Sequence, residues 1–164
     1  MYKSQGYRAC AALGYHIYAT GGLNVTPDRT LKTVQRYDPT RDCWEPVKDM
    51  PVGRTTHATA VLDNHLYVIG GREGEDRCSS RVDRFDPARN EWESVAPLAV
   101  GRAMLVAVTV GDRIYAIGGM THDYASESNE VEAYDAVSNT WTPRTPMSTA
   151  RTAFAAGVVN VAEP

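Results

Sequence analysis

The residues of this chain most able to bind a metal or act as a nucleophile are its four histidines and three cysteines. Zinc sites use closely spaced pairs such as Cys-x-x-Cys or His-Glu-x-x-His, and the sequence contains neither pattern. His16 and His65 occupy equivalent positions of a repeat, where a polar turn residue explains them. We therefore expect no catalytic residue, no metal site and no cofactor, and we expect a protein that is not an enzyme. The seven residues are His16, His57, His65, His122, Cys10, Cys43 and Cys78.

The amino-acid composition also restricts the class of protein. The chain has 164 residues, of which 43% are hydrophobic and 23% charged, as in a soluble globular domain. It has no apolar run long enough to span a membrane, and its N-terminus lacks the apolar core of a signal peptide. The formal charge of −3 argues against nucleic acid as a partner. Unpaired cysteines without a secretory signal predict reduced thiols and a cytoplasmic protein.

Five markers repeat in register along the chain. A Gly-Gly pair recurs at intervals of 49 and 48 residues, and a tyrosine precedes each pair by three positions. Each tryptophan follows an aromatic-Asp pair by seven residues and precedes an arginine by ten. Only the segment between Gly-Gly and the aromatic residue varies in length, which indicates a connection that escapes core packing. The structural markers are Gly21, Gly22, Gly70, Gly71, Gly118, Gly119, Trp44, Trp92, Trp141, Tyr18, Tyr67, Tyr115, Arg54, Arg102 and Arg151.

Each repeat is predicted to form four short strands. In the second repeat these cover roughly 56–62, 65–70, 81–86 and 91–95, which are rich in Val, Ile, Tyr and Trp and separated by turn residues. Four strands per unit of about 50 residues are typical of a β-propeller blade. The whole chain, 1–164, is then a partial propeller with blades at approximately 5–48, 53–96 and 101–145 and an extra strand at 152–159.

The step Met50-Pro51-Val52-Gly53-Arg54, with the Gly-Gly pairs and the spaced Tyr and Trp, resembles kelch repeats. The segment 37–71, YDPTRDCWEPVKDMPVGRTTHATAVLDNHLYVIGG, is most similar to the kelch-like family of animals. The resemblance implies an all-β fold, a kelch β-propeller fragment with three four-stranded blades plus the first strand of a fourth. In that family a BTB and a BACK domain precede a six-bladed propeller. The propeller captures a protein substrate, and the BTB domain recruits a cullin-3 ubiquitin ligase.

The repeat markers also have expected packing roles. We expect each Gly-Gly pair to leave room for the tryptophan of the fourth strand, which is a large side chain to bury. The aspartate of each aromatic-Asp pair is expected to accept hydrogen bonds from backbone amides in an Asx turn.

Two sets of loops combine a fixed scaffold with variable residues, and the resemblance implies that both lie around the mouth of the central channel. One set follows the Gly-Gly pairs, at 23–33, 72–80 and 120–129, and the other follows the repeat arginines. Arg72 is expected to hold a partner carboxylate in a bidentate pair, or else to pair within its own loop. The expected partner-binding residues are Arg72, Glu73, Asn24, His122, Tyr7, Thr56, His57 and Met104.

The sequence therefore favours a non-enzymatic protein-protein interaction module that resembles the substrate-binding propeller of cullin-3 ubiquitin-ligase adaptors. It contains neither BTB nor BACK domain, so cullin-3 is expected to bind only through a domain outside it. Alternatives are part of an enzyme on a kelch-like propeller, of the galactose-oxidase type, or an actin-binding kelch protein. The partner and the kelch-like subfamily stay open.

Both ends of the chain depart from the repeat. Residues 152–159 match the first strand of a fourth blade, and Gln5 stands where the repeat arginine is expected. We expect a fragment, namely a truncated product, a splice form or an incomplete gene model. The alternative is a dimer of two half-rings, in which the extra strand of one copy would compete with residues 7–13 of the other.

Overall fold

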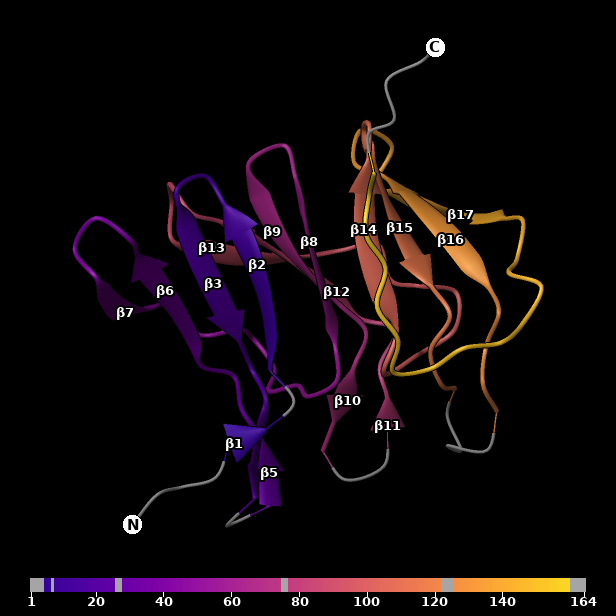
Figure 1. The fold of residues 1–164 in the computed structure, drawn as a ribbon, viewed down its shortest axis with the longest axis horizontal. Helices are drawn as coiled ribbons and strands as arrows, with labels where there is room; N and C mark the ends of the chain where they lie inside the picture. The colour runs from indigo at the N-terminus through magenta and orange to yellow at the C-terminus, as the bar shows by residue number, and fades with distance from the viewer. Residues whose placement is uncertain (1–4, 7, 26–27, 75–76, 122–125, 160–164) are drawn as a thin grey trace.

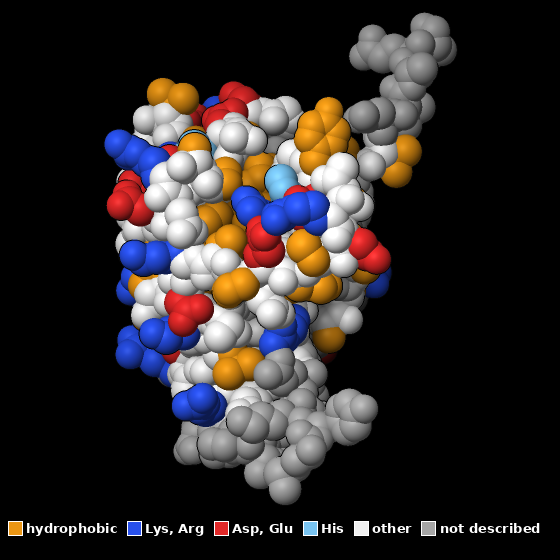
Figure 2. All heavy atoms as spheres, turned by 90° about the vertical axis from the view of Figure 1, so that its left-hand side faces the viewer, with side chains coloured by type: hydrophobic (Ala, Val, Ile, Leu, Met, Phe, Trp, Pro, Cys, Tyr) orange, Lys and Arg blue, Asp and Glu red, His pale blue; other side chains and the backbone are white. Residues whose placement is uncertain are grey.

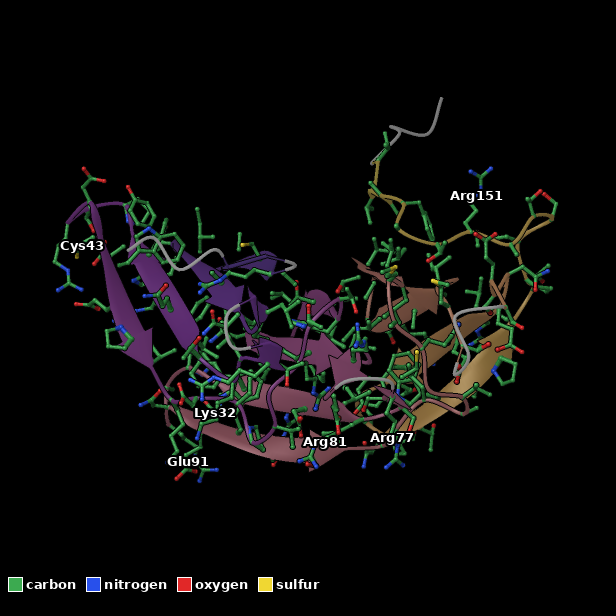
Figure 3. The ribbon with its side chains drawn as sticks, turned by 90° about the horizontal axis from the view of Figure 1, so that it is seen from below. Lys32, Cys43, Arg77, Arg81, Glu91 and Arg151 are labelled. Carbon is green, nitrogen blue, oxygen red and sulfur yellow. The ribbon has the colours of Figure 1, made fainter. Side chains whose placement is uncertain are left out.

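The computed structural model describes residues 5–6, 8–25, 28–74, 77–121 and 126–159. Its main elements are three four-stranded antiparallel sheets, blades 1, 2 and 3, in which each strand pairs with the next strand of the same blade (Figure 1). Seen from below, the blades follow one another along an arc (Figure 3). The all-β class and the three four-stranded blades predicted from the sequence are confirmed.

Each strand of the three blades is five residues long. Inner strands β2, β8 and β14 lie next to one another, and each blade ends on an outer strand that carries the tryptophan. Blade 1 comprises β2 (Ala9–Leu13), β3 (His16–Thr20), β6 (Val34–Asp38) and β7 (Cys43–Val47). Blade 2 comprises β8 (Ala58–Leu62), β9 (His65–Ile69), β12 (Val82–Asp86) and β13 (Glu91–Val95). Blade 3 comprises β14 (Val106–Val110), β15 (Arg113–Ile117), β16 (Val131–Asp135) and β17 (Thr140–Arg144).

The apolar core lies between the blades rather than within them. One cluster joins blades 1 and 2, where Tyr18 meets Phe85 with ring centroids 5.9 Å apart. A second joins blades 2 and 3, where Tyr67 meets Tyr134 at 5.7 Å. Blade 2 is flanked by a blade on each side, so both of its faces are packed, and the stability of a blade depends on its neighbours.

The loops after the first two Gly-Gly pairs contain short strands that the sequence did not predict. In blade 1, β1 (Gln5–Gly6), β4 (Leu23–Val25) and β5 (Asp28–Thr30) form a small sheet. In blade 2, β10 (Arg72–Glu73) pairs with β11 (Arg77–Cys78). These hairpins extend below the blades in Figure 1.

The expected Asx turns are confirmed in all three blades. The Oδ1 atom of Asp86 accepts hydrogen bonds from the amides of Ala88 and Arg89, at 2.8 and 3.2 Å. Asp38 and Asp135 make the equivalent bonds in blades 1 and 3. Each turn closes the hairpin that leads into an outer strand.

Residues 152–159 form no strand, unlike the expected first strand of a fourth blade. In blades 2 and 3 the inner strand is stabilised by a ladder with the second strand of the same blade. The described residues include no second strand with which 152–159 could pair, so the segment runs past blade 3 without a ladder.

Candidate functional site

The repeat arginines anchor the segments that line the channel. The guanidinium groups of Arg54 and Arg102 are fully buried, with 0% exposure. Arg102 pairs with the carboxylate of Glu132 at 2.5 Å and donates to the carbonyl oxygens of Glu130 and Gly118. Arg54 makes the same set of bonds in blade 2, with Asp83 as its carboxylate. Each arginine lies just before an inner strand, and its side chain therefore ties the start of that strand to the later strands of the same blade.

The space beside each Gly-Gly pair is filled by the inner segments around the repeat arginines and not by a tryptophan, so the sequence-based expectation is wrong. A Cβ atom on Gly70 would lie 2.5 Å from the carbonyl oxygen of Arg102, and one on Gly71 would lie 2.7 Å from the Cβ atom of His57. The backbone angles φ of the two glycines, 62° and 93°, also lie in the left-handed region that favours glycine. The Gly71 amide donates to the Arg102 carbonyl at 2.8 Å, which joins the two blades directly.

The tryptophans pack against the aromatic residue opposite them on the neighbouring strand. The ring centroids of Phe85 and Trp92 lie 4.9 Å apart, and those of Tyr134 and Trp141 lie 5.1 Å apart. The seven-residue spacing found in the sequence is thus the register of the outer hairpin.

The two variable sets of loops meet in the structure, as the resemblance to kelch repeats implies. The residue after each repeat arginine pairs with the residue after each Gly-Gly pair. Thr55 and Arg72 exchange two backbone hydrogen bonds of 3.1 and 2.8 Å, and Ala103 and Met120 exchange two of 2.9 and 2.8 Å. In blade 1, Gly6 pairs with Leu23 in the same way.

The second residue after each arginine adopts a left-handed conformation. The φ angles of Thr56, Met104 and Ala153 are 52°, 53° and 50°. The amide of Met104 donates to the Thr56 carbonyl at 2.8 Å, and the amide of Ala153 donates to the Met104 carbonyl at 3.1 Å. Non-glycine residues rarely adopt this conformation, and here the bonds between blades hold it in place.

These positions surround a hollow of about 200 Å³ at the channel. Its chemistry is divided, because Arg8, Thr56 and His57 are polar whereas the residues from the next two repeats are apolar. The backbone is the same at every repeat, so the side chains alone determine what the hollow contacts. The lining residues are Arg8, Thr56, His57, Met104, Leu105, Ala153 and Phe154.

His57 is a buried polar group at the edge of this hollow. Its Nε2 atom lies 2.7 Å from the hydroxyl of Thr20 in blade 1, whereas its Nδ1 atom has no hydrogen-bond partner among the described residues. Burial lowers the pKa of His57 to about 3, and the charge of Arg54 acts in the same direction. His57 is therefore neutral at physiological pH.

The remaining predicted residues have different environments. Glu73 accepts a hydrogen bond from Ser79 and lies 3.8 Å from the Nε atom of Arg54, which places it in the scaffold of blade 2. Asn24 is buried in β4, and Arg72 is half-buried in β10. Tyr7 and His122 lie outside the described residues.

The expected partner-binding residues lacked four lining residues, Arg8, Leu105, Ala153 and Phe154. Ala153 comes two positions after a repeat arginine, and the other three come three positions after a repeat arginine or after Gln5 in its place, so the register of the repeat could have identified them. Within the described part of the chain, no group of three or more His, Cys, Asp or Glu side chains is placed to hold a metal ion. None of the described segments is a helix long and apolar enough to cross a membrane.

Four-stranded antiparallel sheets that follow an arc, with their inner strands next to one another, are the architecture of the β-propeller class. The family model described as the KLHDC2/KLHL20/DRC7 Kelch-repeats domain matches residues 7–161, so the chain belongs to the kelch-repeat family.

Similar curated proteins are kelch-like proteins, matched over part of this chain. Kelch-like protein 15 of Gallus gallus is 41% identical over 63 residues, which are 38% of this chain and 12% of that protein. Kelch-like ECH-associated protein 1B of Danio rerio is 37% identical over 71 residues, or 42% of this chain and 12% of that protein. Kelch-like protein 30 of Homo sapiens is 42% identical over 72 residues, with shares of 43% and 12%. The matched stretch is thus about an eighth of each relative's length.

A solved structure, titled "Structure of YjhT", has the same fold. Its TM-score is 0.78 with 19% identity, and the match covers 90% of this chain and 54% of that one.

Proposed function

We propose that this chain is a non-enzymatic protein-binding module whose partner docks at the channel mouth. The observation that carries the proposal is the hollow bounded by Thr56, Met104 and Ala153, where one left-handed backbone position presents three different side chains. A fixed backbone with varied side chains is how a rigid scaffold presents a recognition surface.

The similarity to kelch-like proteins supports a finer proposal, that the module acts as the substrate-binding part of a cytoplasmic cullin-3 ubiquitin-ligase adaptor. The similar curated proteins include Kelch-like ECH-associated protein 1B. In this proposal a BTB domain outside the printed sequence would contact cullin-3, and the channel mouth would bind the substrate. Arg72 belongs to the same face, because its backbone pairs with Thr55 at the start of the inner segment.

Proximity labelling with single-residue variants tests the binding face. Met104→Lys places a charge in the hollow, and Arg72→Ala removes the side chain of a residue whose backbone pairs with Thr55, next to Thr56 of the hollow, so both should lose the partners that the parent chain labels. Val137→Lys is the matched control, because Val137 is 99% exposed in the β16–β17 turn, at the opposite end of blade 3 from its Gly-Gly pair. If Val137→Lys removes the partners and Met104→Lys keeps them, the proposed face is wrong.

A further inference from the structure

The outer strands β7, β13 and β17 are the open edges of the three sheets, on the opposite side of each sheet from its inner strand. Pro46 of β7, Ser94 of β13 and Pro143 of β17 occupy the same register position in their hairpins. Proline is one of the residues with which proteins protect a sheet edge from pairing with another strand. Of the three described blades, only blade 2 has an outer strand without proline.

The two prolines also show which backbone groups face the open edge. Facing residues in an antiparallel ladder alternate between hydrogen-bonded and non-hydrogen-bonded pairs. Because proline has no amide hydrogen, its pair is of the non-hydrogen-bonded kind, in which the backbone groups point away from the neighbouring strand. By the same register, the amide and carbonyl groups of Ser94 and of Trp92, two residues earlier, point outward from β13. Blade 2 thus offers four backbone groups to an added strand.

A positively charged side chain is held on the Ser94 face of β13. The guanidinium of Arg81 donates to the Ser94 hydroxyl at 2.7 Å and to the two carboxylate oxygens of Asp83 at 3.0 and 2.9 Å. Asp83 also pairs with the buried Arg54, so its single charge is shared between two guanidinium groups. The Arg81 side chain is 36% exposed and therefore presents a positive charge, in a fixed orientation, beside the open edge.

A groove of about 460 Å³ continues this face, between the C-terminal end of β13 and the β10–β11 hairpin. Its described lining residues include Val95 of β13, the two arginines Arg77 and Arg81, and one carboxylate, Glu73. Glu73 lies 3.8 Å from the Nε atom of the buried Arg54, so its charge is partly offset from inside the blade. The groove therefore favours an acidic side chain next to Ser94.

The other face of β13 carries negative side chains. Glu91 and Glu93 are exposed, and they lie on the opposite face from Ser94 because successive residues of a strand face opposite sides. Glu93 pairs with Arg84 on the neighbouring strand. Figure 2 shows positive and negative side chains along its left-hand edge, which is the side where Figure 3 places Glu91 and Arg81. The open edge is thus bordered by opposite charges on its two faces.

We propose that the outer edge of blade 2 binds an extended segment of a partner protein, which adds to β13 as an antiparallel fifth strand. The segment has an acidic side chain opposite Ser94, beside Arg81, and basic side chains opposite Glu93 and Glu91. This surface lies across the sheet from the inner strand β8 and is separate from the channel mouth. Blade 2 has a neighbour on each side, so β13 is the edge of a fully flanked blade.

A peptide titration followed by the amide NMR signals of the chain tests the proposal. The probe is Thr-Val-Glu-Lys-Val-Lys-Thr, which in antiparallel register places its Glu opposite Ser94 and its two Lys opposite Glu93 and Glu91. It should shift the amide signal of Trp92 in a saturable way, with a dissociation constant of about 1 mM or lower from four backbone hydrogen bonds. The charge-exchanged peptide Thr-Val-Lys-Glu-Val-Glu-Thr should bind at least about tenfold more weakly.

Two variants of one residue separate the backbone contact from the side chain. Ser94→Pro copies the outer strands of blades 1 and 3, removes one outward amide and should weaken binding of the probe at least about tenfold. Ser94→Ala keeps that amide and should leave the dissociation constant within about threefold. The charge-exchanged peptide is tested on the parent chain, so that comparison does not depend on the folding of either variant.

Several results would overturn the proposal. They are an absence of saturable binding up to about 5 mM probe, equal binding by the parent chain and Ser94→Pro, and equal binding of the two peptides. Signal changes confined to Thr56 and Met104 would place the peptide at the channel mouth instead. Self-association of the parent chain that Ser94→Pro abolishes would mean that the edge pairs with a second copy of the chain, which would also contradict the proposed occupant.

Discussion

The junction between blades 2 and 3 and the segment that follows blade 3 share one backbone geometry but differ in what they bury. Gly71 donates to the carbonyl of Arg102, and Gly119 donates to the carbonyl of Arg151, both at 2.8 Å. The guanidinium of Arg102 is nevertheless fully buried, whereas Arg151 is exposed at the edge of the structure (Figure 3).

This difference shows that the preceding blade and the following blade contribute separately to the stability of a junction. The preceding blade fixes the backbone path, because it supplies the amide and carbonyl groups that hold the first residues of the junction. The following blade supplies the carboxylate and the carbonyl oxygens that allow a charged side chain to be buried. A blade therefore positions the start of its neighbour, but the arginine contributes to stability only where that neighbour packs over it.

The largest effect is expected from removing a buried arginine. Arg102→Met leaves the carboxylate of Glu132 buried without its counter-charge and should cost about 3–5 kcal/mol of unfolding free energy. Arg151→Met, at an exposed position, should change it by less than about 0.5 kcal/mol. Urea denaturation of both variants measures the difference, and equal losses would refute the distinction between the two regions.

The tryptophans should show a smaller difference of the same kind. Trp92→Ala removes a ring packed on Phe85 and a hydrogen bond to Lys48, and should cost about 3 kcal/mol. Trp44→Ala should cost about 1 kcal/mol, because half of that side chain is already exposed. Thermal melts of the two variants provide the test, and a larger loss for Trp44→Ala would contradict the ranking.

The junction between blades 1 and 2 should also be sensitive to acid. The native pKa of His57, about 3, lies below the ordinary value of 6.5, so between these limits the unfolded chain binds a proton that the native chain does not. Stability should fall as the pH decreases from about 6.5, by up to about 1.4 kcal/mol per pH unit from this group.

His57→Leu, which copies Leu105 at the equivalent position of the next junction, should remove that part of the pH dependence. Chemical denaturation at several pH values from about 4 to 7 measures it. An unchanged acid profile in the variant would show that His57 is not the group responsible.

Much of the fold followed from the sequence because the repeat markers are tied to repeated backbone contacts. The seven-residue spacing of Phe85 and Trp92 is a hairpin register, and the aspartate turns are local, so both could be inferred within one repeat. The role of Gly70 could not, because its constraint is a carbonyl oxygen on the next blade, 32 residues away in the chain.

The sequence predicted only part of the candidate site. Thr56, His57 and Met104 were identified because the second and third positions after the repeat arginine differ between repeats, and these residues do line the hollow. Asn24 and Glu73 also differ between repeats, but the hairpins and the contact with Arg54 direct them into the scaffold. Sequence variation alone does not distinguish a side chain that faces the channel from one that packs between loops.

Native-state hydrogen exchange most directly tests the central claim, that the preceding blade sets the junction backbone and the following blade makes it stable. The amides of Gly71 and Met104 and those of Gly119 and Ala153 make equivalent hydrogen bonds. The first two should exchange only on global unfolding, and the last two through local opening, with protection lower by at least tenfold. Equal protection at both places would contradict the account, because it would mean that the preceding blade alone makes the junction stable.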